Sequence, residues 1–450
     1  MISKELLKKY DTPVPRYTSY PTVPYWSDSP TTEEWIEAVN QAASKKDATW
    51  SIYVHIPFCE TLCTFCGCNT VISRNHDKEG SYVETLLTEF EHYQAKTPGL
   101  FDKPLRQLHL GGGTPTFLSA ENLKVLVERL LLKVKVDHSQ FDGSLEVDPR
   151  RTNKEQLKAL YDLGFRRVSM GVQDFNEEVQ RLINRVQPFD ITKNLTDQAR
   201  EMGYTSVNYD LIYGLPKQSL SMMRETVERT IELRPDRIAL YSFALVPWIK
   251  PQQRLFKDED LPVGAEKREL YELSYELLTG AGYREIGMDH FALPEDELSK
   301  SMDQGRLHRN FMGYAELRTD VLLGLGVSAI SEAPTCFHQN EKLVANYQKR
   351  VLDGEIPTLR GHKLSQEDQQ QREMILRFMT QGEVQIADAA QKQDVEEFLS
   401  PMIRDGLVKV DGQKLIVLDQ GRPFLRNACM ALDVRLRKNK PDSKVFSQSL

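Results

Sequence analysis

Apolar, β-branched runs alternate with amphipathic segments along the first half of the chain. Six runs have the composition of strands covered on both faces, at residues 50–56, 106–110, 144–147, 167–172, 206–212 and 237–245. Between them, apolar residues recur every three or four positions, which predicts helices over residues 81–90, 120–132, 154–163, 189–202 and 219–233. This alternation favours parallel strands joined by right-handed crossovers.

A polar or glycine-rich motif follows nearly every predicted strand. Alternation alone would suit a doubly wound open sheet equally well. The repeated motifs favour a barrel, because barrel enzymes gather their chemistry at the C-terminal ends of the strands. We therefore expect an α/β fold, a partial (β/α)6 TIM-like barrel with an N-terminal extension and a mostly helical C-terminal domain.

The pattern weakens after about residue 250. A helix is expected over residues 267–280. Earlier in the chain, Thr152 is expected to cap the helix at residues 154–163. A strand is expected at residues 283–291, and an apolar run that contains glycines covers residues 320–331. Helices are expected at residues 366–380, 394–405 and 421–437. An Asp-Gly pair predicts a hairpin over residues 407–417, and a polar tail at 438–450 is expected to be mobile.

These differences in sequence pattern along the chain suggest three domains. Residues 1–48 form an N-terminal segment covering the active site, 49–360 the barrel and its extension, and 361–450 a helical domain with a β-hairpin. Helices with a hairpin also suit a winged helix. The mixed local charge, without an obviously basic recognition helix, argues against DNA binding.

Composition is that of a globular protein, with 40% apolar and 27% charged residues among 450. The net charge of −7 excludes a generally basic nucleic-acid coat. No apolar stretch approaches the ~20 residues of a membrane-spanning helix, and the first ten residues lack the apolar core of a secretory signal. We therefore expect a cytoplasmic protein without membrane or nucleic-acid partners.

Four of the six cysteines lie within ten residues, directly after the first predicted strand: Cys59, Cys63, Cys66 and Cys68. A structural zinc site usually draws pairs of ligands from separated segments, whereas these are crowded and Cys66-x-Cys68 is tight for tetrahedral chelation. An iron–sulfur cluster fits better, since three thiolates on a four-iron cubane leave one iron open. The isolated Cys336 and Cys429 are expected to be inert thiols.

The C-x3-C-x2-C loop after a first strand resembles the signature of the radical S-adenosylmethionine (SAM) superfamily. The glycine run Gly111-Gly-Gly113 after the second strand resembles its cofactor loop. This resemblance implies that the open iron binds the methionine part of SAM. It also implies that the reduced cluster cleaves SAM to methionine and a 5′-deoxyadenosyl radical, which abstracts hydrogen from substrate.

Motifs from about Pro15 to Leu436 narrow the resemblance. They are the segments at residues 15–21, 66–69, 171–175, 288–291, 307–311 and 326–331. Together they resemble the oxygen-independent coproporphyrinogen III oxidases, also called coproporphyrinogen dehydrogenases. The resemblance implies anaerobic oxidative decarboxylation of two propionates of coproporphyrinogen III to vinyl groups, giving protoporphyrinogen IX in heme biosynthesis.

The same resemblance implies a set of site residues. The ligands of the 4Fe–4S cluster would be Cys59, Cys63 and Cys66, with Cys68 nearby but not ligating. Two SAM molecules are expected. The first would be held by Tyr53, Gly112, Glu146 and Ile330. The second would touch Phe65, Gly113, Thr114, Gln173, Arg185, Asp210 and Ala244. The residues counted as catalytic are the three cluster cysteines and Tyr53.

The substrate's four propionates call for cationic partners. Arg16, His308 and Arg309 are the candidates, and the acidic chain needs a local positive patch to hold them. An electron donor, an electron acceptor and a monomeric state are also expected, the first two unidentified.

Two positions depart from the family pattern: Met312 replaces an expected glutamine and Phe243 an expected tyrosine. Each substitution removes a polar group. They leave open a related radical enzyme acting on another tetrapyrrole, as a methyltransferase or in heme-ring opening. A heme-binding chaperone that keeps the cluster is the alternative that is not an enzyme.

Overall fold

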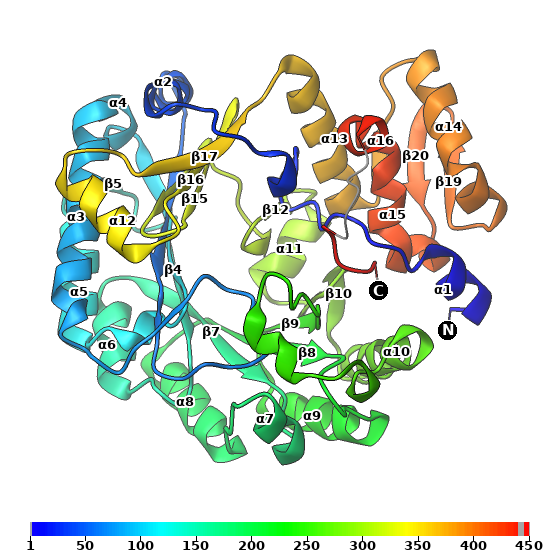
Figure 1. Cartoon of the computed structure of the whole chain (residues 1–450), viewed down its shortest axis with the longest axis horizontal. Helices are drawn as coiled ribbons and strands as arrows, with labels where there is room; N and C mark the ends of the chain where they lie inside the picture. Colours follow the sequence, from blue (N-terminus) through cyan, green and yellow to red (C-terminus); the bar gives the residue numbers. More distant parts are fainter. Residues whose placement is uncertain (1, 440–444, 450) are drawn as a thin grey trace. The chain divides into compact units, whose positions relative to one another are not determined.

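The computed structural model describes residues 2–439 and 445–449, and its chain forms two compact units (Figure 1). Unit 1 comprises Met1–Tyr25, Leu211–Arg318 and Ser365–Leu450, and unit 2 comprises Trp26–Asp210 and Thr319–Leu364. The units group segments by contact, so the predicted N-terminal segment 1–48 is shared between them. The three predicted domains stay a prediction about organisation along the chain.

The strands of unit 2 form a sheet in the order β17-β16-β15-β14-β1-β4-β6-β7-β8. Their bounds are β1 (Trp50–Ile56), β4 (Pro104–Gly112), β6 (Asp142–Val147), β7 (Phe165–Gln173), β8 (Ser206–Tyr213), β14 (Val321–Leu325), β15 (Ile330–Ala333), β16 (Cys336–Asn340) and β17 (Thr358–Lys363). Strands β1, β4, β6 and β7 pair in parallel, as their apolar composition predicts. The unit boundary falls within β8, whose last three residues belong to unit 1. The predicted α/β fold with a parallel core is confirmed.

The apolar run at residues 320–331 is split into β14 and β15, which pair antiparallel. The break comes at Gly326, whose φ of +98° belongs to the left-handed region. An added Cβ there would lie 2.6 Å from the carbonyl oxygen of His55, so this turn needs glycine.

The predicted helices of unit 2 form between its parallel strands. They are α3 (Lys78–Lys96), α5 (Ala120–Leu131), α6 (Lys154–Asp162) and α8 (Phe189–Met202), and Figure 1 shows them along the outer side of the strands. The remaining elements of the unit are α2 (Thr32–Ala43), β2 (Phe58–Cys59), β3 (Val71–Ile72), α4 (Pro98–Phe101), η2 (Pro115–Phe117), β5 (Lys135–Val136), α7 (Glu177–Leu182) and α12 (Val344–Leu352). The predicted cap Thr152 is wrong, because its hydroxyl donates to the carbonyl of Asp148. Asn153 caps α6 instead, accepting from the backbone of Gln156.

In unit 1, the end of β8 is followed across the sheet by β9 (Arg237–Ser242), β11 (His290–Ala292) and β10 (Arg284–Gly287). Strand β9 ends before the predicted residue 245, because the backbone N–H of Val246 donates to a side chain, Gln253, and Pro247 follows. The strand predicted at 283–291 is an antiparallel pair, β10 and β11, that turns at Met288 and Asp289.

The other elements of unit 1 are largely helical. They are α1 (Lys4–Tyr10), η1 (Val23–Tyr25), α9 (Leu220–Leu233), η3 (Pro251–Leu255), η4 (Asp258–Asp260), α10 (Gly264–Gly280), α11 (Glu297–Asp303), β12 (His308–Asn310), β13 (Gly313–Ala315), α13 (Gln366–Gln381), β18 (Glu383–Gln385), α14 (Ala389–Arg404), β19 (Val408–Asp411) and β20 (Lys414–Val417). The hairpin of β19 and β20 is confirmed, and β18 adds a third strand to it.

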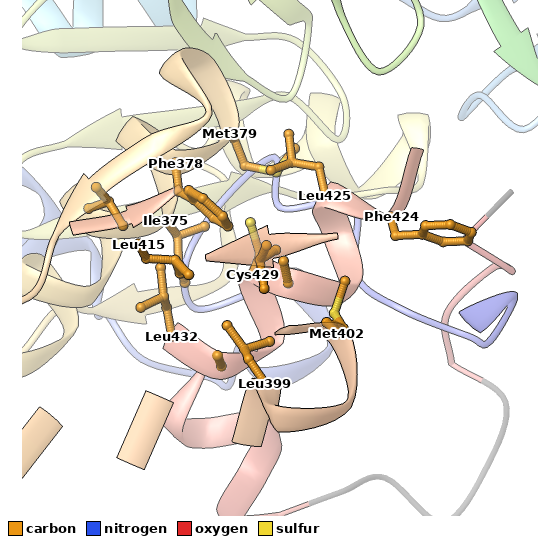
Figure 2. Close-up of a cluster of buried hydrophobic side chains, with 14 of the residues drawn as sticks. Ile375, Phe378, Met379, Leu399, Met402, Leu415, Phe424, Leu425, Cys429 and Leu432 are labelled. Carbon is orange, nitrogen blue, oxygen red and sulfur yellow. The ribbon is translucent and has the colours of Figure 1, made fainter. Parts of the chain in front are cut away.

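A hydrophobic core fills the C-terminal part of unit 1 (Figure 2). It gathers side chains from α13, α14 and the chain after β20, and α1 contributes Leu7 and Tyr10. Cys429 lies fully buried among them, where burial raises the pKa of its thiol. This is the environment of an inert cysteine.

One prediction about the end of the chain is wrong. The helix expected at 421–437 is broken into η5 (Asp419–Phe424), α15 (Leu425–Cys429), η6 (Met430–Leu432) and α16 (Val434–Lys438). Pro423 donates no backbone hydrogen bond, and the Asp433 side chain starts α16 by accepting from Leu436.

The tail at 438–450 was expected to be mobile, and residues 440–444 and 450 lie outside the described residues. Residues 445–449 are tied down, since Gln448 bridges to Pro13 and Arg426 donates to the carbonyls of Gln448 and Ser449. In the described part of the chain, no helix is long and apolar enough to cross a membrane.

Candidate active site

The cysteine loop leaves the end of β1 and folds back on itself in unit 2. Strand β2 pairs in parallel with β3, and the backbone N–H of Cys66 donates to the carbonyl of Cys63. Two guanidinium nitrogens approach the Cys63 sulfur, Nη1 of Arg185 at 3.6 Å and Nη2 of Arg150 at 3.7 Å. The two guanidinium groups therefore place positive charge beside a sulfur that the sequence predicts to be a cluster ligand.

A cavity of about 170 Å³ brings most of the predicted site residues together. The predicted residues that line it are Cys59, Cys63, Phe65, Cys66, Gly112, Gly113, Thr114, Glu146, Gln173, Arg185 and Asp210. Except for Arg185, which follows α7, they come from the cysteine loop and from the C-terminal parts of β4, β6, β7 and β8 or the residues after them, so the strand ends meet as the barrel hypothesis requires.

Three predicted residues do not line this cavity. Tyr53 is buried beneath it: its ring stacks on His109 at 5.8 Å between centroids. Its hydroxyl lies 3.0 Å from Nδ1 of His55, which limits its freedom to contact a ligand in this conformation. Ile330 is the half-buried first residue of β15, and Ala244 follows β9 in unit 1. Their assignment to SAM stays a prediction.

The glycine run is built for close packing against the first strand. The N–H of Gly113 donates to the carbonyl of Ile56 at 2.7 Å, and the N–H of Gly112 donates to Glu146 at 3.1 Å. Gly112 has a φ of +116°, which non-glycine residues rarely adopt. An added Cβ at Gly113 would lie 2.6 Å from the carbonyl oxygen of Pro57.

We expect Gly113→Ala to lower stability by about 1–3 kcal/mol, because the new methyl group overlaps backbone that cannot shift cheaply. The change should also displace the cysteine loop and lower the iron content. Thermal unfolding and iron analysis of anaerobically purified protein measure both. The control is Gly80→Ala on the open side of α3, where nothing lies within 4 Å. Equal melting temperatures for the two variants would contradict this reading of the loop.

Charge is arranged unevenly around the cavity. Burial would raise the pKa of Glu146. The hydrogen bond from His109, the electrostatic interaction with His109 and the hydrogen bond from the N–H of Gly112 instead hold that pKa below its ordinary value. Burial and the charge of Glu146 raise the pKa of Asp210 to about 7, against the hydrogen bonds from Ser169 and Asn208. The two carboxyl groups therefore differ in their readiness to carry charge at neutral pH.

The resemblance did not assign three polar residues that line the cavity: Asp148, Arg150 and Ser169. Asp148 is paired with Arg150 at 2.7 Å and with Arg185 at 3.3 Å, so it orients both guanidinium groups near Cys63. In the sequence, the feature that could have identified Asp148 was its position at the end of the third predicted strand. Nothing in the chain order indicates that Arg185, 37 residues later, returns to it.

Cys68 differs from the other three cysteines of the loop. Its side chain is exposed, and its backbone N–H donates to the sulfur of Cys66 at 3.4 Å. A backbone donor lowers the charge density on a ligating sulfur without a second thiolate being needed.

We expect Cys68→Ser to keep about the wild-type iron content, because the N–H of residue 68 is unchanged, although turnover can fall. Iron and sulfide analysis of anaerobic protein is the measurement. Loss of most of the iron would make Cys68 a ligand and revive the four-thiolate alternative.

The donor set fits an iron–sulfur cluster and a charged cofactor. All four cysteines of the loop line the same cavity, the three predicted ligands among them, and soft thiolates are the ligands that such clusters take. Within residues 2–439 and 445–449, no three Cys, His, Asp or Glu side chains are gathered tightly enough for a single metal ion. The buried Nε of Arg185 has no hydrogen-bond partner in the described structure, which leaves a donor for an anionic group.

Comparison with known proteins gives consistent matches. The model of the radical SAM superfamily matches residues 53–230. The oxygen-independent coproporphyrinogen III oxidase of Escherichia coli is 40% identical over 96% of this chain and 95% of its own length. That of Synechocystis is 37% identical over 100% of this chain and 98% of its own.

A solved structure of coproporphyrinogen III oxidase from Escherichia coli, described as a radical SAM enzyme, superposes with a TM-score of 0.88. It is 38% identical in sequence and covers 96% of this chain and 98% of its own. Matches that cover 96% or more of this chain include the cysteine loop, the strand ends and most of the C-terminal part. The chain therefore belongs to the oxygen-independent coproporphyrinogen III oxidase family of the radical SAM superfamily.

Proposed function

We propose that this protein is the oxidoreductase that converts coproporphyrinogen III to protoporphyrinogen IX without oxygen, in heme biosynthesis. The observation that carries the proposal is the gathering of Cys59, Cys63 and Cys66 with polar strand ends around one cavity. When bound, the reduced cluster supplies the electron that cleaves SAM to methionine and the radical that takes hydrogen from the β carbon of a propionate. Each reacting propionate loses carbon dioxide and one further electron, which goes to an acceptor.

The residues around the cavity bind and orient the cofactors. We propose that Glu146, charged at neutral pH, accepts from the ammonium of the first SAM, with Gly112 beside it and Tyr53 and Ile330 contributing. The N–H of Gly112 already donates to Glu146, which fixes the carboxylate in place. For a second SAM we propose Arg185 as the partner of the carboxylate and Asp210 as an acceptor for ammonium or ribose hydroxyls. Phe65, Gly113, Thr114, Gln173 and Ala244 complete this second set.

Gln173 supports a binding role at the end of β7. It adopts a φ of 69°, a conformation that costs free energy in a residue other than glycine and clusters at functional sites. An added Cβ on the neighbouring Gly171 would lie 2.8 Å from Nε2 of Gln173 and 3.0 Å from Nη2 of Arg185. Glycine at 171 therefore lets these two side chains turn toward the cavity.

The two departures from the family pattern have local explanations. Phe243 is buried and packs edge-on against Phe256, with 5.7 Å between ring centroids, so the ring serves packing without a hydroxyl. Met312 lies in the turn between β12 and β13, where its backbone N–H donates to Asn310. Neither position requires a different substrate.

The test is anaerobic reconstitution with iron and sulfide, followed by reaction with coproporphyrinogen III, SAM and a chemical reductant. We expect protoporphyrinogen IX, with methionine and 5′-deoxyadenosine released. Equilibrium dialysis should give two SAM molecules per chain, and size-exclusion chromatography should give a monomer. Tight binding of heme without turnover would support a chaperone instead, and methylated or ring-opened tetrapyrrole would support the other radical enzymes. An electron-donor protein and a cytoplasmic location complete the proposal.

A further inference from the structure

A second, larger cavity lies wholly within unit 1. Its volume is about 490 Å³, in the range of sites that enclose organic ligands. Tyr213 and Ser242, at the ends of β8 and β9, line it, so strand ends open into this cavity too. Four arginines also line it: Arg16, Arg268, Arg422 and Arg426.

The acidic side chains of this cavity are already paired. They are Glu285, Asp289, Asp303 and Glu383. Each has a cationic partner within 4.0 Å, and these partners are, in the same order, Arg422, Arg16, Arg284 and Lys414. A third lining arginine pairs within its own helix, since Arg268 lies 3.1 Å from Glu272. Among the described residues, Arg426 is left as the lining arginine without an acidic partner.

Within the described part of the chain, Arg426 is a buried cation without an acidic partner. Only 7% of Arg426 is exposed, and none of the residues next to it in the sequence is acidic. It donates to three neutral oxygens, the carbonyls of Val14 at 3.3 Å, Gln448 at 2.6 Å and Ser449 at 2.5 Å. A guanidinium has five N–H donors, so two remain. Carbonyls satisfy hydrogen bonds but cannot neutralise the charge, and a buried charge without a counter-ion is costly.

Lys267 adds a second cation of the same kind. Its ammonium donates to the carbonyl of Phe243 at 2.8 Å, lies 5.9 Å from the centre of the Tyr213 ring, and forms no ion pair within the described residues. Burial lowers the pKa of Lys267 to about 8; Asp11 opposes this shift, while Arg426 and Arg16 add to it. The two cations thus repel each other, and a bound anion between their fields would relieve both.

Building on the proposed function, we propose that this cavity anchors propionate carboxylates of coproporphyrinogen III through Arg426, while Lys267, which does not line the cavity, adds positive charge nearby. A carboxylate oxygen can accept from an N–H that Arg426 leaves open, on Nε or on Nη1, and the charge of the guanidinium strengthens that hydrogen bond. The anchored propionates are those that survive the reaction, because a carboxylate held in an ion pair throughout cannot leave as carbon dioxide. The cavity therefore supplies the local positive charge that an acidic chain needs for a tetra-anionic substrate.

His308, a candidate from the sequence, does not share this role. Burial lowers the pKa of its imidazole to about 3, so it is neutral at working pH and offers no charge. Arg16 is engaged by Asp289 at 2.8 Å. Arg309 is buried, with two guanidinium nitrogens lacking hydrogen-bond partners, but it does not line the cavity.

The experiment compares Arg426→Gln, Arg426→Lys and Lys267→Met with the wild type. We expect Arg426→Gln to raise the KM for coproporphyrinogen III about 10- to 100-fold, with kcat changed far less, and Arg426→Lys to recover part of the loss. Lys267→Met removes the second charge without touching the contacts of Arg426, and it should raise KM by a smaller factor, because Lys267 does not line the cavity. Arg422→Gln is the matched control, because Arg422 lines the same cavity but is 60% exposed and paired with acids. It should stay close to the wild-type KM.

Binding of two further probes tests which propionates are held. Protoporphyrinogen IX, which keeps two carboxylates, should lose as much affinity as the substrate when Arg426 is changed. Etioporphyrinogen, which has none, should bind weakly and equally to all variants. Unchanged KM in both Arg426→Gln and Lys267→Met, in folded protein that still turns over, would overturn the inference alone. A wild-type protein that makes no protoporphyrinogen IX would instead overturn the proposed function. If Arg426→Gln lowers the affinity for coproporphyrinogen III but not for protoporphyrinogen IX, the cavity holds the propionates that react, and the proposal is wrong.

Discussion

Cys59→Ser should abolish the visible absorption of the iron–sulfur cluster together with all SAM cleavage and porphyrin turnover. The hydroxyl of serine is a poor ligand for iron, and two remaining thiolates cannot hold a cubane in place. Loss of an outer-shell partner alone costs about ten- to hundredfold in metal affinity, so loss of a ligand should cost at least that. Cys59 lies beside Thr114, with 3.4 Å between sulfur and hydroxyl oxygen, and burial raises the pKa of its thiol to about 11. A ligand that must be a thiolate in such surroundings depends on iron to lose its proton.

The measurement is iron and sulfide content of anaerobically purified protein, with SAM cleavage assayed in parallel. The matched control is Cys336→Ser, which replaces a fully buried cysteine of β16 in the same unit, away from the cysteine loop. That variant should lose some thermal stability but keep its iron. A Cys59→Ser protein with a full complement of iron would show that the cluster uses other ligands, and zinc without iron in the wild type would be equally damaging.

Much of the architecture could be read from apolar periodicity. The limits of α8 match the predicted helix, and β1 matches the predicted strand, because both are long, strongly patterned and bounded by clear breaks. Strands β16 and β17 were missed. Strand β16 has the sequence Cys-Phe-His-Gln-Asn, and all five residues are buried. Because three of them are polar, the sequence pattern does not predict a buried strand here.

One buried polar residue of β16, Asn340, is explained by a partner far along the chain. Glu89 in α3 is fully buried, accepts from Asn340 and Tyr347 at 2.6 Å each, and accepts from the N–H of Gly326 at 2.8 Å. These contacts hold the turn that leads to Ile330. They join residues about 250 positions apart, and local pattern does not reveal such pairs.

The cysteine loop and the strand-end motifs identified most of the cavity, because barrel topology alone brings strand ends together. Roles within the cavity came from resemblance. The ion pairs that orient them, such as Asp148 with Arg185, depend on the fold. The unpaired charge of Arg426 is likewise invisible in the sequence, where it stands in a segment predicted as plain helix.

Asp210→Ala should leave the cluster and the first SAM in place but weaken binding of a second SAM and stop decarboxylation. Asp210 lines the cavity and accepts from Ser169 at 3.1 Å and from Asn208 at 3.0 Å, which fixes both of its oxygens. Losing one charge-assisted hydrogen bond costs about 1.5–3 kcal/mol, or about ten- to hundredfold in affinity. The pKa of Asp210, raised to about 7 by burial and by Glu146, adds a pH signature. Below that pH the group is neutral, so wild-type affinity for the second SAM should rise as pH rises through 7.

Anaerobic equilibrium dialysis gives the SAM stoichiometry, with iron content and porphyrin products assayed on the same samples. Asp210→Asn is the matched control, because an amide of the same shape can keep contacts with Ser169 and Asn208 while losing the charge. It should fold as the wild type does, bind the second SAM weakly and lose the pH dependence between 6 and 8. If the wild type binds one SAM per chain yet turns over fully, the second site does not exist. If Asp210→Asn keeps both the second SAM and its pH dependence, the carboxylate is a structural group and another residue holds the ligand.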